Sequence, residues 1–532
     1  MGTGAEILWN EWEPEVLSRA AAEGKLIFLD IGATWCHWCH ELDRTSLSDP
    51  RVVKMLNEDF LPVRVDVDRR PDINDRYNQG GWPTTAVLLP DGQLLAGATY
   101  LPPDALAGVL SRCRDFYRRD RARVDEYMCV TATSGKEERG SARGEPRPED
   151  LAIVEHAVLA QYDPEHPGFF REPKFPVTDI LFFLLDAWDA EGNPEMGETL
   201  LRVLRTMAAS GVFDPVEGGF FRYATRRDWS VPHYEKMLSD NAELLSLYAS
   251  VYQKTKEAAF ASTGRDVLRF LFGKLHDPGT GAFFGSQDAD ETYYPLPAPE
   301  RARRFPPAVD RTLFSEYNAR AASALIVAHR AFGAPAGAAG EGDSLLARGE
   351  RLGRFLHDGF WRGEEGQARY AERPCVPGNA PSGLLADHAS AATAYLDLFD
   401  ATGKEEYLRF AEDALAFAVS RLYREELGGF TDRRSSPEDF GGLAVPFVPF
   451  AANAQAACAL MRFARATGRA EYFAIAVRTL GGLSAGYDKR GAFAAPYGRA
   501  LLLYGKGKAG AACLPGDPSC GAGRGTLHPP LP

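Results

Sequence analysis

The sequence has 532 residues, 45% of them hydrophobic, and a formal net charge of −13 at pH 7. This length predicts more than one domain, and the apolar content is enough for large cores. The negative charge argues against a surface that binds nucleic acid or an anionic membrane. No run of about 20 apolar residues is present, so no membrane-spanning helix is expected. Residues 1–12 show no secretory signal pattern, and we expect a cytoplasmic protein.

The N-terminal part of the chain alternates between strand and helix patterns. The predicted elements are helices over 13–23 and 103–118 and strands over 26–31, 61–67, 85–89 and 94–99. The last two strands flank Asp91-Gly92, a strong hairpin signal. Alternation that ends in a hairpin and a closing helix predicts an α/β domain over residues 1–130.

The segment 35–40, WCHWCH, holds two of the eight cysteines and follows the strand over 26–31. A thiol at the start of the next helix meets the positive end of the helix dipole, which lowers the thiol pKa. The pattern is consistent with a redox pair, a metal site, covalent haem attachment or two inert cysteines. Haem attachment requires an export signal, and four such close ligands cannot all reach one tetrahedral metal. We therefore predict a redox pair, with Cys36 as nucleophile and Cys39 as resolving thiol, and no metal or other cofactor.

Two residues outside the segment 35–40 indicate the kind of fold that holds the cysteine pair. Asp30 lies six residues before Cys36, and Pro83 lies 44 residues after Cys39, behind Trp82. An aspartate, a Trp-Cys-x-x-Cys segment and a proline in this order resemble the thioredoxin fold. The resemblance implies that Asp30 lies beneath the pair and takes the proton of Cys39; a structural carboxylate is the alternative. It also implies a cis Pro83 that presents the Trp82 backbone to an extended substrate.

The residues around the cysteines are candidates for substrate binding. His37 and His40 would add hydrogen-bond donors and, when protonated, positive charge near the thiolate. Trp38 and Trp82 are placed in the same group. We expect Cys36 to be partly exposed and Cys39 to be buried.

Beyond the first domain the pattern changes to long helices. Residues 131–149 are rich in Gly, Ser, Arg, Glu and Pro and are predicted to be a linker. Residues 150–505 show about twelve helices, with glycine followed by an aromatic residue between helix pairs. These six turns lie at 167–170, 218–221, 281–284, 358–361, 428–430 and 491–493. Six helical hairpins that close on themselves predict an (α/α)6 toroid, although such turns also end helices in other α proteins. Residues 506–532 are predicted to be a flexible tail that holds Cys513 and Cys520.

Longer motifs in the N-terminal domain and in the helical region point to the same protein family. They are Val65-Asp66, Arg70-Pro71-Asp72-Ile73, Gly80-Gly81-Trp82-Pro83, Pro173-Lys174-Phe175-Pro176, the segment 231–238, Asp240-Asn241 and Asp288-Ala289-Asp290. Together they resemble the thioredoxin-domain proteins with a C-terminal six-hairpin toroid, the family of the animal spermatogenesis-associated thioredoxin-like protein and its bacterial relatives. The toroid of that family is similar to those of sugar 2-epimerases and six-hairpin glycosidases. Between Tyr77 and Gly80 this chain is shorter than the family pattern, which would open the groove beside the dithiol.

One mouth of the toroid is expected to collect polar residues. The candidates are Lys174, His233, Glu235, Asp240, Asp288, Asp290, Asp387 and His388. Asp240 also fits a capping box, and His388 shares a helical face with apolar residues, which favours a core role. We predict that Asp288 and Asp290, supported by His233 and Glu235, converge within about 10 Å around a cavity, with a loop turn as the alternative for the two aspartates.

Three functions remain open from the sequence. The first is a thiol–disulfide oxidoreductase whose partner is a disulfide-containing protein or a reductase. The second is a sugar-active enzyme with a regulatory thioredoxin domain. The third is a non-catalytic protein whose toroid binds a hydroxylated small molecule. No nucleic-acid or membrane partner is expected under any of them.

Overall fold

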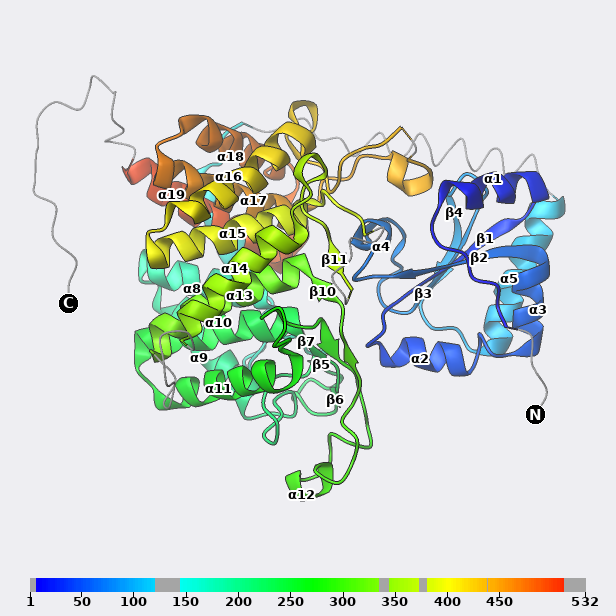
Figure 1. The fold of residues 1–532 in the computed structure, drawn as a ribbon, viewed down its shortest axis with the longest axis horizontal. Coiled ribbons are helices and arrows are strands. Elements are labelled where there is room, and N and C mark those ends of the chain that lie inside the picture. The colour runs from blue at the N-terminus through cyan, green and yellow to red at the C-terminus, as the bar shows by residue number, and fades with distance from the viewer. Residues whose placement is uncertain (1–5, 120–143, 334–343, 373–379, 438, 511–532) are drawn as a thin grey trace, which may run out of the picture.

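The computed structural model describes residues 6–119, 144–333, 344–372, 380–437 and 439–510. It contains a thioredoxin-like domain beside one end of a helical toroid, with short strands between the two (Figure 1). Most of the predicted linker and nearly all of the predicted tail, with Cys513 and Cys520, fall outside the described residues.

The thioredoxin-like domain is a four-stranded sheet with helices on both faces. Its elements are α1 (Pro14–Glu23), β1 (Leu26–Gly32), α2 (His37–Arg44), α3 (Pro50–Asp59), β2 (Phe60–Asp66), α4 (Pro71–Tyr77), β3 (Thr84–Leu88), β4 (Leu94–Ala98) and α5 (Pro103–Arg119). The strand order is β2-β1-β3-β4, with β1 parallel to β2 and antiparallel to β3. The predicted strands, the hairpin and the closing helix are all present.

Strand β1 is buried on both faces, as its continuous apolar sequence requires. Leu26 and Phe28 pack against residues of α2, α3 and α5 on one face. Ile27 and Ile31 pack toward α1 and α4 on the other face. Asp30 and Gly32 follow the same alternation as Phe28, because successive side chains of a strand point to opposite faces. Both therefore lie on the face that carries the cysteine helix.

Twelve of the helices in the described residues form two concentric rings. The inner ring is α8 (Thr178–Glu191), α10 (Leu238–Thr255), α13 (Ser315–Phe332), α15 (Leu385–Thr402), α17 (Phe450–Thr467) and α19 (Ala495–Gly510). The outer ring is α7 (Pro148–Leu159), α9 (Pro194–Ala208), α11 (Ala258–Phe270), α14 (Leu345–Phe360), α16 (Glu405–Phe417) and α18 (Ala470–Leu483). Each inner helix packs against the next, and α19 closes the ring against α8. The predicted (α/α)6 toroid is confirmed.

The glycine–aromatic turns are tied to the inner helices by one repeated side chain. Asn241, Asn318 and Asn453 each stand fourth in their inner helix and are fully buried. Each carboxamide accepts the N–H and donates to the carbonyl of the aromatic residue in the preceding turn. Those aromatic residues are Phe220, Phe283 and Phe430. The turns are therefore part of the repeat, because their backbone groups would otherwise be buried without partners.

The two domains are joined by buried contacts. Met237 and Leu443 of the toroid half belong to the core on the α1 and α4 side of the sheet. Arg76 on α4 forms an ion pair with Asp432 at 2.6 Å, with both side chains less than a tenth exposed. The Tyr77 hydroxyl accepts the N–H of Gly442 at 2.6 Å. These contacts fix which face of the thioredoxin-like domain meets the toroid.

Candidate functional site at the domain junction

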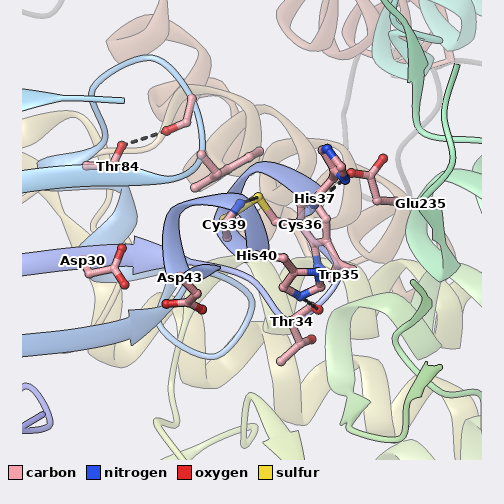
Figure 2. The surroundings of a disulfide bond; sticks show 12 residues. Asp30, Thr34, Trp35, Cys36, His37, Cys39, His40, Asp43, Thr84 and Glu235 are labelled. Atoms are coloured by element: carbon pink, nitrogen blue, oxygen red, sulfur yellow. Dashed lines mark hydrogen bonds between the residues drawn. A yellow bond between two sulfur atoms is a disulfide. The ribbon is translucent and has the colours of Figure 1, made fainter. Parts of the chain in front are cut away.

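The cysteine pair lies at the start of α2. Cys36 is the N-cap residue, and its sulfur accepts the N–H of Cys39 at 3.2 Å. The two cysteines form a disulfide, with their Cα atoms 5.2 Å apart (Figure 2). Cys36 is 5% exposed and Cys39 is 9% exposed. The prediction of a partly exposed Cys36 is therefore wrong for the oxidised protein, because both sulfurs are covered.

Asp30 is buried and lies on the same face of β1 as Gly32, which is close to Cys39. A β-carbon at Gly32 would lie 3.3 Å from the Cys39 sulfur, and Asp30 is the preceding residue on that face of β1. Burial raises the pKa of Asp30 to about 6, although the Arg64 guanidinium, 2.8 Å away, opposes the shift. Asp30 thus has a pKa suited to exchanging a proton near neutral pH.

The proline loop carries aromatic side chains beside the disulfide. The Trp82–Pro83 peptide bond is cis, as predicted. The Trp82 ring meets the Trp35 ring edge-on, with centroids 5.9 Å apart. Trp38, which is 43% exposed, contacts Tyr100 at 5.3 Å. A hollow of about 360 Å³ lies between Trp38, Trp82, Tyr100 and Thr99.

The toroid supplies carboxylates to the same site. Glu235 accepts the His37 N–H at 3.4 Å, at the first residue of the dithiol helix (Figure 2). Glu291 pairs with the His37 ring at 2.8 Å. Partial burial raises the pKa of Asp288, although the charge of His40 opposes the shift. We call Glu235, Asp288 and Glu291 the rim carboxylates.

Glu235 is the most enclosed of the rim carboxylates. It is 2% exposed, and its Oε2 atom has no hydrogen-bond partner among the described residues. Burial would raise its pKa, but the hydrogen bond with His233 and the charge of Arg222 hold the pKa below the usual value. Arg222 also lies over the rings of Trp35 and Trp82, at 4.6 and 5.1 Å. The toroid therefore contacts the dithiol site from both sides of Cys36.

His233 and His40 complete the immediate surroundings. The His233 ring stacks on Tyr223 and lies 5.9 Å from the His37 ring. His40 bonds through Nε2 to the Thr34 carbonyl at 2.9 Å (Figure 2). Of the predicted toroid residues, His233, Glu235 and Asp288 thus lie at the dithiol, while the sequence assigned them to a separate pocket.

The Asp290 side chain stabilises a turn in its own loop. Its Oδ1 atom accepts the N–H groups of Thr292 and Tyr293 at 2.8 and 2.9 Å. These bonds hold the pKa of Asp290 below its usual value, against partial burial. The loop-turn alternative therefore describes Asp290, and the predicted pairing of Asp288 with Asp290 as two reactive carboxylates has no support in the geometry.

Lys174 and His388 form hydrogen bonds that stabilise the fold. Lys174 is fully buried and donates to Asp163 at 2.9 Å and to two backbone carbonyls. His388 stands fourth in α15, the position of the repeated asparagine, and its Nε2 accepts the Gln367 N–H at 3.1 Å. Burial lowers the pKa of His388 to about 4, so the ring is neutral. Both side chains satisfy buried backbone groups of the turns.

Asp240 and Asp387 both stand third in an inner helix. The Asp387 carboxylate accepts from Arg369 at 3.1 Å and from the Glu316 N–H at 3.2 Å. Burial raises the pKa of Asp387 to about 7. Burial also raises the pKa of Asp240, against the charges of Arg222 and Arg320. The N-cap of α10 is Met237, so Asp240 is not the cap that the sequence suggested.

A buried hydrogen-bond network joins the dithiol segment to the toroid, and it was not predicted from the sequence. Trp35 donates through Nε1 to Asp68 at 2.6 Å, and the Tyr317 hydroxyl donates to the other Asp68 oxygen at 2.5 Å. Arg369 donates to the Asp68 carbonyl at 2.8 Å and also pairs with Glu316. Asp68 follows the end of β2, and acidic residues at a strand end were the available signal.

A second space lies within the helical ring. It is a cavity of about 880 Å³ lined mainly by inner helices, with Pro71, Asp72 and Asp75 of the thioredoxin-like domain among its lining residues. Its polar lining includes Thr178, Glu243, Glu316, Arg320 and Gln455. Among the described residues, none of the eight toroid candidates from the sequence lines it. We call this space the toroid cavity.

In the part of the chain that the structure describes, no helix is long and apolar enough to cross a membrane. Within the same residues, no group of three or more His, Cys, Asp or Glu side chains is placed to hold a metal ion.

Residues 3–133 match the family model Thioredox_DsbH, described as "Protein of unknown function, DUF255". Residues 3–133 therefore carry the domain of this family. The chain is also 32% identical over 319 residues to human spermatogenesis-associated protein 20, a match that covers 56% of this chain and 40% of that protein. It is 32% identical over 78 residues to thioredoxin-1 of Drosophila melanogaster, covering 15% and 70% of the two chains. The chain thus spans about two fifths of the human relative.

The toroid has structural relatives among sugar-converting enzymes. A D-mannose isomerase superposes with a TM-score of 0.52 at 13% identity, covering 68% of this chain and 98% of that chain. The cellobiose 2-epimerase of Spirochaeta thermophila superposes with a TM-score of 0.52 at 16% identity, covering 68% and 95%. At these identities the similarity establishes the fold of the toroid and leaves its chemistry open.

Proposed function

We propose that the protein is a thiol–disulfide oxidoreductase and that Cys36 and Cys39 are its redox centre. The observation that carries the proposal is the disulfide at the N-terminus of α2, on a thioredoxin-like sheet. The helix N-terminus stabilises a Cys36 thiolate, since the first backbone N–H groups of a helix have no intrahelical partners. Asp30 then accepts the Cys39 proton during resolution, as its raised pKa allows.

Trapping of the intermediate tests this proposal. In Cys39→Ser the attack by Cys36 on bis(2-hydroxyethyl) disulfide, a neutral reagent, produces a stable mixed disulfide that intact mass spectrometry detects. Cys36→Ser is expected to form none. Cys113→Ser is the matched control, because Cys113 is a buried free thiol in the same domain. An adduct in Cys36→Ser, or none in Cys39→Ser, contradicts the assigned roles.

We propose a second role for the toroid cavity, the binding of a hydroxylated small molecule. The cavity of about 880 Å³ has the size of a ligand site and a lining that mixes aromatic, carboxylate, amide and guanidinium groups. Arg320 faces it, with Glu243 and Glu316 as ion-pair partners and with an Nε atom that has no partner among the described residues. The fold relatives act on mannose and on cellobiose, so these sugars are the first probes.

Thermal unfolding with mannose and with cellobiose tests the second role. A ligand at 100 times its Kd stabilises the folded state by about 2.7 kcal/mol, which is a measurable rise in Tm. The rise is expected to disappear in Gln455→Ala and to persist in Arg205→Ala, whose ion pair lies on the outer surface. No rise in Tm at 100 mM of either sugar contradicts binding of these two probes.

A further inference from the structure

The toroid covers the face of the thioredoxin-like domain where a substrate reaches the dithiol. Trp35 and His37 flank Cys36 in the sequence, and toroid side chains contact both. Arg222 lies over the Trp35 ring, and Glu291 pairs with the His37 ring. Cys36 remains 5% exposed. A folded protein therefore cannot place a disulfide of its own against this sulfur without moving the toroid.

The opening that remains is small and aromatic. A hollow of about 360 Å³ lies between Trp38, Trp82, Thr99 and Tyr100. Trp38 stands between the two cysteines in the sequence, and Trp82 precedes the cis proline. The exposed Trp38 side chain forms one wall of the hollow, and the Trp38 ring lies 5.8 Å from the His37 ring. This space suits the carbon chain of a small disulfide.

The charge beside the opening is negative. All three rim carboxylates lie around His37 and His40, and Glu235 and Glu291 contact His37 directly. Against these three carboxylates stands the Arg222 guanidinium, which lies over the rings of Trp35 and Trp82, and Trp82 lines the hollow. The chain as a whole carries −13. Carboxylates in a partly enclosed site attract cations and repel anions more strongly than they do in open water.

We infer that the substrate of the dithiol is a small disulfide with cationic arms, and this inference rests on the proposed oxidoreductase function. The Cys36 thiolate attacks one substrate sulfur, forms the mixed disulfide and expels one substrate thiolate, which takes up a proton. The Cys39 thiolate then attacks the Cys36 sulfur and expels the second thiolate. Two electrons pass from the dithiol to the substrate, which becomes two thiols, and the Cys36–Cys39 disulfide is regenerated.

Single-turnover kinetics of the full chain test the inference. Reduced protein, freed of reductant, is mixed with cystamine, bis(2-hydroxyethyl) disulfide, oxidised glutathione or insulin, and formation of the protein disulfide is followed by mass spectrometry. Each rate is divided by the rate of the same disulfide with dithiothreitol, which removes differences in intrinsic reactivity. At low salt we expect normalised rates about tenfold higher for the dication cystamine than for anionic glutathione disulfide, with the neutral reagent between them and the ratio falling as salt rises.

Two matched variants test which carboxylate makes the protein react faster with cystamine than with oxidised glutathione. Glu291→Gln is expected to reduce the cystamine-to-glutathione ratio about threefold, because this half-exposed carboxylate lies at His37. Glu58→Gln removes the same charge from an exposed position on α3 and is expected to leave the ratio unchanged. Equal effects of the two variants overturn the assignment to the rim.

The outcomes separate the two proposals. If the neutral disulfide does not oxidise the protein, the oxidoreductase function fails and the inference fails with it. If the neutral disulfide reacts but oxidised glutathione is as fast as cystamine, only the cationic substrate class is overturned. If insulin reacts as fast as the small disulfides, the covered dithiol is not selective for small substrates and the inference is also overturned.

Discussion

The rim carboxylates and the toroid cavity are both polar regions of the toroid, yet their charges are balanced differently. In the cavity, Glu316 pairs with Arg320 and Arg369, and Arg499 pairs with Asp186. At the rim, three carboxylates are gathered around histidine rings and one arginine: Glu235 lies by His233 and Arg222, and Glu291 pairs with the His37 ring. Balanced ions hold neighbouring helices together, whereas unbalanced charge changes the chemistry of whatever lies beside it. In this comparison the excess of carboxylate charge lies beside the dithiol.

The balanced network is expected to show the largest effect on stability. Arg369→Ala removes a side chain that is 3% exposed and leaves Glu316 and Asp387 without their shared cation. Such a loss costs about 3–5 kcal/mol of unfolding free energy, because a buried charge remains uncompensated. Chemical denaturation measures it.

The control for this network is Arg354→Ala, whose ion pair with Glu406 is half-exposed. It is expected to change the unfolding free energy by less than about 0.5 kcal/mol. Similar losses in the two variants would show that burial of the network does not distinguish it from the surface.

The protonation of Asp387 gives the network a pH dependence. Its pKa of about 7 in the folded state lies above the value of about 3.9 in an unfolded chain. The group therefore stabilises the fold fully below pH 4, and this contribution is lost as the pH rises through 7, with a slope of up to about 1.4 kcal/mol per pH unit. In Asp387→Asn the fall between pH 5 and 8 is expected to be smaller. Asp290→Asn is the control, because the pKa of Asp290 is lowered and this group titrates below pH 5. If Asp387→Asn leaves the pH dependence of stability unchanged, Asp387 is not its source.

Asp30 is expected to control the resolving step. Because its pKa is about 6, release of substrate thiol from the Cys36 mixed disulfide is expected to accelerate as the pH rises through 6. Asp30→Asn lowers this rate about tenfold at pH 7 and removes the inflection, since no carboxylate remains to accept the Cys39 proton. Stopped-flow thiol detection measures the profile, and Glu58→Gln, which removes an exposed carboxylate on α3, is expected to keep it. Retention of the inflection in Asp30→Asn excludes Asp30 as the base.

His388 is expected to tolerate the asparagine that the repeat places at its position. His388→Asn keeps an acceptor for the Gln367 N–H and is expected to change the unfolding free energy by less than about 1 kcal/mol. His388→Ala leaves that N–H unsatisfied and is expected to cost about 1–3 kcal/mol. Neither variant is expected to alter the normalised rates of disulfide reduction. A loss of dithiol activity in His388→Asn would show that the ring has a chemical role.

The sequence predicts best the arrangements that depend on neighbouring residues alone. Cys36, Cys39 and Asp30 lie within ten residues on one strand–helix unit, and their arrangement follows from that unit. The turns before Phe220, Phe283 and Phe430 were found because each repeats a glycine and an aromatic residue. The predicted turn at 358–361 is wrong: these residues end α14, and the equivalent turn has Gln367 in place of the aromatic residue. His388 was placed among the pocket candidates, because its equivalence to Asn241 and Asn318 becomes visible only when the inner helices are aligned.

The junction could not be predicted in the same way. Glu235 and His37 are 198 residues apart, and their contact depends on how the two domains pack. The packing depends in turn on Arg76 with Asp432, 356 residues apart, and on toroid side chains that enter the other domain's core. Carboxylates near helix-flanking loops were visible in the sequence, but nothing in the sequence showed that they would face the cysteines.

The redox potential of Glu235→Gln tests the shared site most directly. A carboxylate beside the N-terminus of the dithiol helix disfavours the Cys36 thiolate, so its removal favours the reduced form and makes the potential less negative. We expect a rise on the order of 30 mV, equivalent to about 1.4 kcal/mol, measured by equilibration with dithiothreitol buffers at pH 7. Glu58→Gln, with the same change in total charge, is expected to keep the potential of the parent protein. An unchanged potential in Glu235→Gln would contradict the conclusion that the toroid and the dithiol form one site.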